Sequence, residues 1–139
     1  MGGAAVGAEI IIPPLKAKQG EIIDIPVLVD KADNIAGIKL TITYDKELLI
    51  FKEGNTSKST RSVMLVVNDK TPGRLIIVMA GAKCVSGREV TLLTLTFEVK
   101  KQSSGVRSTR IDILDAQLMS DQLKDVTVGV NVKSLDILP

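Results

Sequence analysis

Strict alternation of apolar and polar residues is the feature of this sequence that most restricts its fold. From Leu93 to Val99, apolar side chains at odd-numbered positions alternate with threonine or glutamate. The same period of two runs through residues 35–44 and 125–132. Successive side chains of a strand point to opposite faces, so each such segment predicts a strand with one buried face. No long segment carries a helical period, and we therefore expect an all-β protein.

Prolines, glycines and polar turns divide the chain into short strands. Pro13 and Pro14 end an opening strand over residues 8–12, because proline cannot donate to a strand ladder. Further strands are expected over residues 21–30, 35–44, 48–52, 62–69, 74–81, 91–100, 109–120 and 125–138. Roughly nine strands joined by short turns predict an antiparallel two-sheet β-sandwich. We expect residues 8–139 to form this single domain, after a flexible leader or cloning remnant over residues 1–7.

The absence of histidine excludes the commonest catalytic and metal-binding arrangements. Without histidine the chain has no ordinary general base, no usual zinc ligand and no Ser–His or Cys–His nucleophile. The lone Cys84 cannot form an internal disulfide, and we interpret it as a passive apolar residue. Acidic residues lie mostly in turns, without the spacing of a calcium loop. We therefore expect no enzymatic activity and no cofactor or metal bound by this chain.

Charge and aromatic content restrict the possible ligands. Eighteen basic and sixteen acidic residues give a net charge of +2, without the clustered basic face that nucleic-acid binding needs. One tyrosine, two phenylalanines and no tryptophan leave few rings to stack on sugars, and these rings lie in apolar strand patterns. No apolar run is long enough to span a membrane, and the first residues lack the pattern of a signal peptide. A carbohydrate-binding module and a structural or adhesin domain stay as alternatives to a protein-binding module.

Two segments break the alternation because both of their faces are apolar. In SVMLVVND, Met64 and Val66 make apolar the face opposite to the one that we expect in the core. In RLIIVMAG, we expect the even-numbered residues to point inward and Leu75, Ile77 and Met79 to point outward. A strand that is apolar on both faces is usually covered on both.

Three interpretations of this second apolar face stay open. A loop could cover it, a second copy of the chain could pack against it, or another protein could dock there, as exposed apolar patches commonly indicate. Lys39 and Thr41 would belong to the same outer surface if their strand is a neighbour. The result would be an apolar centre with a mixed rim, which is typical of protein interfaces.

Residues 19–54 resemble the opening of a cohesin domain. Cohesins begin a strand with glycine and a polar residue, carry an internal Pro-Val, and enter an alternating strand through a small residue followed by glycine. That strand ends in Tyr-Asp, and a short strand of the form xLLxF follows. The matching features are Gly20, Pro26 and Val27, Ala36 and Gly37, Tyr44 and Asp45, and Leu48 to Phe51. GRLIIVMAG, VTLLTLTFEVK and VTVGVNVKSLDI follow in the family's order, so the resemblance spans residues 8–138.

The resemblance implies a nine-stranded jelly-roll sandwich that binds dockerin modules. In cohesins the dockerin packs two calcium-loaded helices against a flat sheet face formed by the third, fifth, sixth and eighth strands. Calcium would then belong to the dockerin, and the cohesin to a larger extracellular or cell-surface scaffold, cellulosomal or not. Transferred to this sequence, the contacts would be Gly37, Lys39, Thr41, Met64, Val66, Asn68, Leu75, Ile77 and Met79.

The sequence also departs from the pattern of well-known cohesins. These often place Asn or Asp on the third strand, where this chain has Gly37 and Lys39. The loop GAKCVSG is not acidic and contains a single serine, whereas the corresponding loop in the family is often acidic and rich in Ser and Gly. An unpaired lysine is costly to bury, so we expect a divergent dockerin with an acidic side chain near Lys39.

Overall fold

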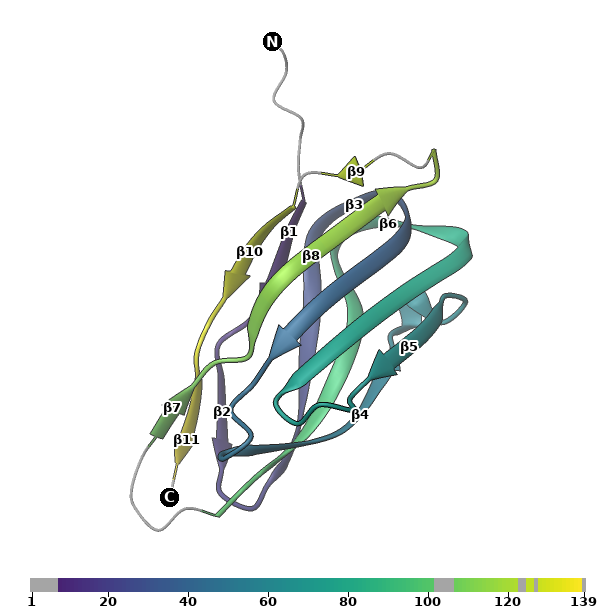
Figure 1. The fold of residues 1–139 in the computed structure, drawn as a ribbon. Coiled ribbons are helices and arrows are strands. Elements are labelled where there is room, and N and C mark those ends of the chain that lie inside the picture. The colour runs from purple at the N-terminus through teal and green to yellow at the C-terminus, as the bar shows by residue number, and fades with distance from the viewer. Residues whose placement is uncertain (1–7, 102–106, 123–124, 127, 139) are drawn as a thin grey trace.

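The computed structural model describes residues 8–101, 107–122, 125–126 and 128–138, except the side chains of residues 82–84 and 107. The expected leader at residues 1–7 and the interpretation of Cys84 fall outside this description. The described part forms eleven strands and one 3-10 helix (Figure 1). The elements are β1 (Ala8–Ile12), β2 (Leu15–Lys18), β3 (Ile22–Thr43), β4 (Leu49–Thr56), η1 (Lys58–Thr60), β5 (Met64–Asn68), β6 (Arg74–Val99), β7 (Arg107–Thr109), β8 (Asp112–Ser120), β9 (Asp125–Val126), β10 (Val128–Val132) and β11 (Leu135–Leu138).

Two long strands, β3 and β6, each replace a pair of shorter predicted strands. They run antiparallel along nearly their whole length, from the pair Ile22–Glu98 to the pair Thr43–Arg74. Register shifts between Ala32 and Gly37 mark the place where the paired strands change course. Polar and glycine-containing segments predicted the loops here, but the pairing continues through them. The backbone turns with positive φ at Asn34, Gly87 and Glu89.

The bend in β3 and β6 places their halves in two layers. The first half of β3 and the second half of β6 lie between β1 and β4, and β10 extends this layer next to β1. The second half of β3 and the first half of β6 lie between β8 and β5, and β9 pairs with β8. A small sheet of order β2–β11–β7 completes the fold. The predicted jelly-roll β-sandwich is thereby confirmed, although β1 with β10 and β2 with β11 pair in parallel rather than antiparallel.

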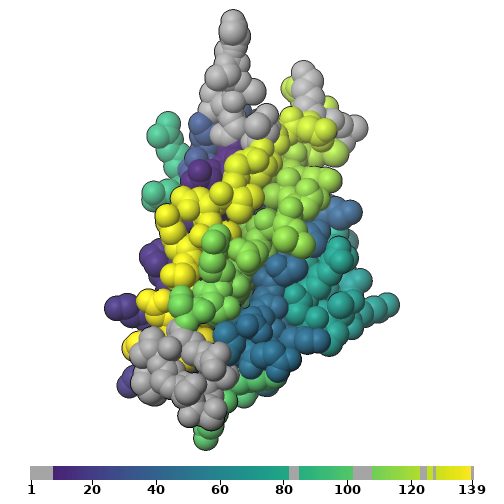
Figure 2. All heavy atoms as spheres, turned by 60° about the vertical axis from the view of Figure 1, so that its left-hand side comes forward, coloured from purple at the N-terminus to yellow at the C-terminus, as the bar shows by residue number. Residues whose placement is uncertain are grey.

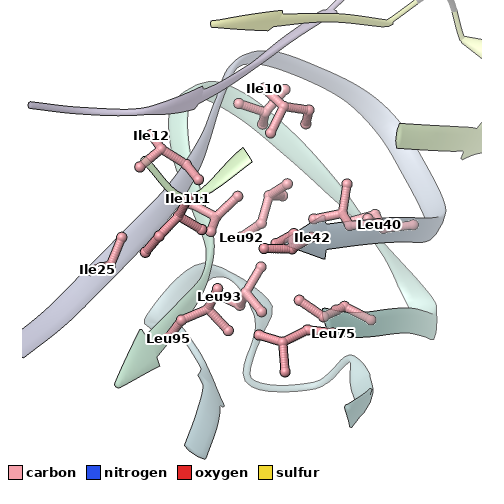
Figure 3. Packing of buried hydrophobic residues seen from close by; sticks show 14 of the residues in the cluster. Ile10, Ile12, Ile25, Leu40, Ile42, Leu75, Leu92, Leu93, Leu95 and Ile111 are labelled. Atoms are coloured by element: carbon pink, nitrogen blue, oxygen red, sulfur yellow. The ribbon is translucent and has the colours of Figure 1, made fainter. Parts of the chain in front are cut away.

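Apolar side chains from both layers meet in one core. Ile10 and Ile25 extend from one layer, and Leu40, Ile42 and Leu75 extend from the other (Figure 3). The alternation predicted the inward faces of the two halves of β3 correctly, since Ile25, Leu40 and Ile42 are buried. The fold therefore rests on the same period-two pattern that predicted it.

The three aromatic side chains form a cluster in and beside this core. Phe97 is fully buried, and its ring centroid lies 5.0 Å from that of Tyr44 and 5.5 Å from that of Phe51. Both contacts are edge-to-face, the geometry that aromatic pairs prefer. These rings therefore pack against one another, as the sequence predicted, instead of forming a flat platform for sugars.

Candidate protein-interaction face

Four neighbouring strands, in the order β8–β3–β6–β5, present one continuous outer surface of the sandwich. Pairing in register aligns their outward side chains into rows across the strands, and paired side chains on one face lie about 5 Å apart at Cβ. We call this surface the four-strand face. Its rows are Met119–Gly37–Ala80–Met64, Gln117–Lys39–Val78–Val66 and Asp115–Thr41–Ile76–Asn68.

The strands of this face lie side by side at the front of Figure 1. Figure 2 shows the flank of the face, where β8 packs between β10 and the second half of β3. Both neighbours fix β8, which therefore closes the face along one side. Because the strands belong to the same bent sheet as the rear layer, the face is held by the core beneath it.

Large apolar side chains are exposed on the four-strand face. The exposed fractions are 69% for Met64, 53% for Val66, 41% for Val78 and 38% for Met119. These are half of the eight large apolar residues that are exposed in the described part of the chain, and Val66 and Val78 are cross-strand neighbours, so the residues form a patch. Contiguous exposed apolar surface on a soluble domain marks an interaction site.

The outer surface of the opposite layer serves as an internal comparison, because it is mixed: Ile22 and Ile50 are exposed there on either side of Glu98, beside polar residues. Thr96 donates a hydrogen bond to Asp24 at 2.7 Å, and Lys52 forms an ion pair with Glu98 at 3.3 Å. Thr94 lies on the same strand and face as Thr96. Both surfaces contain part of β6, but on the four-strand face the exposed Val66 and Val78 are direct cross-strand neighbours, whereas Glu98 separates Ile22 from Ile50 on the opposite surface.

A hollow of about 200 Å³ lies in the four-strand face between β8, β3 and β6. Its floor contains Gly37 and Ala80, the two small residues in the row between Met119 and Met64. Lys39 and Asp125 are on its rim, so it is an apolar depression with one charge of each sign beside it. A methyl group built on Gly37 would lie 3.6 Å from Cβ of Met119, an ordinary contact distance, so a side chain at this position would be accommodated against Met119.

Lys39 carries the positive charge at the centre of the four-strand face. Its row neighbours are Gln117 on β8 and Val78 on β6. Asp115, the nearest carboxylate along β8, accepts a hydrogen bond from Nε2 of Gln117 at 3.4 Å. Over the described ranges, ion pairs join Lys52 to Glu98 and Arg110 to Asp112, and none includes Lys39.

Six of the nine predicted site residues lie on the four-strand face as expected. Their strands bring together Gly37, Lys39, Thr41, Met64, Val66 and Asn68. Thr41 is the exception in exposure, because its neighbours leave it buried. The arrangement supports the prediction that β3 and β5 share an outer surface, while a binding role for these residues stays a prediction.

The predicted outward orientation of Leu75, Ile77 and Met79 is wrong. All three side chains are buried in the core, with exposed fractions of 0–1%. The pairing of β6 with β3 and β5 places the other three residues of the strand outward instead. RLIIVMAG is apolar on both faces, so its pattern does not define which face is inward, and a shift by one residue exchanges the faces. The outward residues of β6 are Ile76, Val78 and Ala80.

The contribution of β8 was not assigned to particular residues by the sequence. Asp115, Gln117 and Met119 face the same side as Lys39, while Leu118 is buried. The alternation in DAQLMS was the available signal, but Leu118 and Met119 are both apolar and leave its phase undefined. The resemblance to cohesins indicated the eighth strand without indicating its residues.

Metal and membrane features are absent over the ranges that the structure describes. Among those residues no cluster of three or more histidine, cysteine, aspartate or glutamate side chains could hold a metal ion. Within the same ranges no helix has the length and apolar character needed to cross a membrane.

An exposed apolar patch on the outer sheet face of a β-sandwich is typical of protein-interaction modules. Comparison with protein families gives the particular family. The model of the Cohesin domain family matches residues 8–136. The chain therefore belongs to the cohesin family, which is a family of non-catalytic binding modules. A comparison with curated protein sequences gives no significant match.

Solved cohesins share this fold at low sequence identity. A non-cellulosomal cohesin from the hyperthermophilic archaeon Archaeoglobus fulgidus is 19% identical with a TM-score of 0.84, over 96% of this chain and 93% of that one. The sixth cohesin of scaffoldin B from Acetivibrio cellulolyticus, solved in complex with a mutant Cel5 dockerin, is 16% identical with a TM-score of 0.85, over 95% and 99%. A type I cohesin–dockerin complex from Clostridium thermocellum contains a chain that is 14% identical with a TM-score of 0.84, over 99% and 98%.

Proposed function

We propose that this cohesin domain is a non-catalytic module that binds a dockerin domain through the four-strand face. The observation that carries the proposal is the exposed apolar patch of Met64, Val66, Val78 and Met119, which lie on three of the four paired strands. Cohesins with a similar fold from Acetivibrio cellulolyticus and Clostridium thermocellum occur in complexes with dockerins. The family and the patch thus support the same kind of partner.

The mechanism is the burial of a preformed surface. Val66 and Val78 would supply the dry centre of the interface, and Lys39, Asn68 and Gln117 would fix the register of the partner through polar contacts. A stable complex of this kind buries about 1,600 Å² in total. Because the face is part of a bent sheet over a common core, little ordering of the cohesin would oppose binding.

The partner and the setting follow from the same proposal. Calcium would be bound by the dockerin, whose loops would supply the oxygen ligands that calcium prefers. The cohesin would be one part of a larger extracellular or cell-surface protein that assembles enzymes or other dockerin-bearing proteins. The dockerin-bearing cargo need not be a cellulase, since the non-cellulosomal Archaeoglobus fulgidus cohesin has the same fold.

Binding to purified dockerin domains from the same organism tests this function. With the cohesin immobilised, at least one calcium-loaded dockerin should bind with a dissociation constant below about 1 μM, equivalent to about −8 kcal/mol. A chelator should abolish binding by acting on the dockerin, while the thermal unfolding of the cohesin alone should not change. Failure of every dockerin to bind in calcium would contradict the proposal.

Self-association through the same face is the competing explanation of the exposed patch. Sedimentation velocity at micromolar concentration should show a monomer that forms a one-to-one complex after dockerin is added. A dimer that the Val78→Asp substitution dissociates would instead assign the patch to contact between two copies of this chain. Cellulose pull-down gives the corresponding check for carbohydrate binding, and we expect the protein to remain in the supernatant.

A further inference from the structure

The hollow between β8, β3 and β6 has the properties of a side-chain pocket. We infer, resting on the proposed function, that it receives one bulky apolar side chain of the dockerin, and that a carboxylate beside this side chain pairs with Lys39. The structure thus assigns a two-part recognition pattern to the partner. Gly37 and Ala80 would contact the apolar side chain, and Lys39 would form an ion pair with the carboxylate.

The size and lining of the hollow fit an apolar side chain. Its volume is about 200 Å³, and an apolar cavity of about 150 Å³ is already large enough to take up benzene. Gly37 and Ala80 leave the space open, and Met119 on the rim has an unbranched thioether chain that can adjust to the guest. A buried anchor in a pocket near the centre of an interface is the usual form of a binding hot spot.

The two charges on the rim define where the partner's own charge must lie. Lys39 lines the hollow and has no ion-pair partner in the described ranges, so covering it with an apolar surface would be unfavourable. Asp125 lies on the same rim and would repel a carboxylate near it. The acidic side chain of the dockerin should therefore be on the Lys39 side of the apolar anchor. Gly37 and Lys39 are two residues apart on β3, a separation of about 6.7 Å.

This pattern would separate cognate from non-cognate dockerins. A dockerin with a small or polar residue in place of the anchor would leave the hollow unfilled, with apolar surface on both sides. A dockerin with a basic residue opposite Lys39 would bring two like charges into the interface. Specificity of this kind rests on a favourable contact together with a repulsive one.

Filling the hollow from the cohesin side tests the apolar part. The Gly37→Val substitution places a side chain where a Cβ makes only an ordinary contact with Met119, and valine suits a strand. Gly129→Val on β10 is the matched control, because a Cβ there meets no atom within 4 Å and β10 is outside the four-strand face. We expect Gly37→Val to weaken binding of the dockerin identified with the wild-type protein by at least tenfold. Gly129→Val should bind within twofold of the wild type, and both variants should keep the wild-type circular dichroism spectrum.

Reversing the charges tests the acidic part. Lys39→Glu should weaken binding by at least tenfold, and a dockerin with the facing carboxylate changed to lysine should restore it. The facing carboxylate is found by changing each exposed Asp or Glu of the dockerin outside its calcium loops to Lys, one at a time. Absence of any restoring dockerin variant would overturn the assignment of Lys39.

The outcomes distinguish this inference from the proposed function. If Val78→Asp abolishes binding but Gly37→Val leaves it unchanged, the hollow is no pocket and the dockerin-binding function stands. If the wild-type cohesin binds no calcium-loaded dockerin, both proposals fail. Loss of binding in Gly37→Val, together with a restoring partner for Lys39→Glu, would support the complete pattern.

Discussion

Replacing Val78 with aspartate should abolish dockerin binding while the sandwich stays folded. Val78 is half exposed, and its row neighbours are Lys39 on one side and Val66 on the other, so it lies at the centre of the four-strand face. A carboxylate there would have to be desolvated in an apolar contact region. The loss should be at least about 2 kcal/mol, or about 30-fold in affinity, as measured by isothermal titration calorimetry.

The matched control for this prediction is Thr94→Asp. Thr94 lies on the same strand, β6, but its side chain is on the outer surface of the opposite layer. The control introduces the same charge in place of another β-branched residue, so it includes the modest unfavourable effect of aspartate on a strand. Binding should be unchanged in this control. Equal losses in both variants, or none in Val78→Asp, would remove the four-strand face as the binding surface.

Replacing the preceding residue of the same strand, Ile77, should affect folding instead of binding. Ile77→Asp should prevent folding, because the side chain of Ile77 is completely buried in the core. A carboxylate at this position would have no charge partner and no water. The milder Ile77→Ala should retain the fold but lower the free energy of unfolding by about 2–5 kcal/mol.

Circular dichroism and urea denaturation measure this second prediction. Ile77→Asp should lose the far-ultraviolet signal of a β-sheet protein, and Ile77→Ala should unfold at a lower urea concentration with an unchanged slope. Val78→Ala is the control, since a surface substitution changes stability by only about 0.5 kcal/mol. A folded Ile77→Asp protein that loses only dockerin binding would show that this side chain points outward after all.

These two neighbours illustrate why part of the site could not be predicted from the sequence. In the strand segment of β3 that contains Lys39, polar residues separate the apolar ones, and the inward face was predicted correctly. In the segment of β6 from Leu75 to Ala80 both sets are apolar, so either could have been inward, and only the partner strands define the choice. Lys39 pairs with Val78 and not with Ile77, and that register depends on the whole sheet.

Local sequence patterns also did not predict that β3 and β6 would each continue as one long strand. The segment around Asn34 and the glycine-containing segment around Gly87 carry turn-forming residues, which predicted breaks between strands. In the folded chain the backbone amide of Asn34 donates a hydrogen bond to the hydroxyl of Ser86 at 2.9 Å, so the two segments turn together. The contact joins residues 52 positions apart, and no short window of sequence contains both.

The hollow is formed by three segments that are far apart in the sequence. Gly37, Ala80 and Met119 come from three strands, and each residue alone is unremarkable in its own segment. Only the register across β8, β3 and β6 places the two small residues side by side. The sequence could therefore predict an apolar surface, but the shape within that surface required the folded sheet.

The two parallel pairs, β1 with β10 and β2 with β11, have a consequence for the response of the domain to tension. They join the first described strands to the last ones, through five residue pairs and four residue pairs respectively. In Figure 1, β1 begins at the upper end of the molecule and β11 ends at the lower end. A force that pulls residues 8 and 138 apart would slide these strands past each other lengthwise, loading their hydrogen bonds together instead of opening them one at a time. Such a domain would resist extension until several bonds fail at once, and its lifetime under load would depend on the rate of that step.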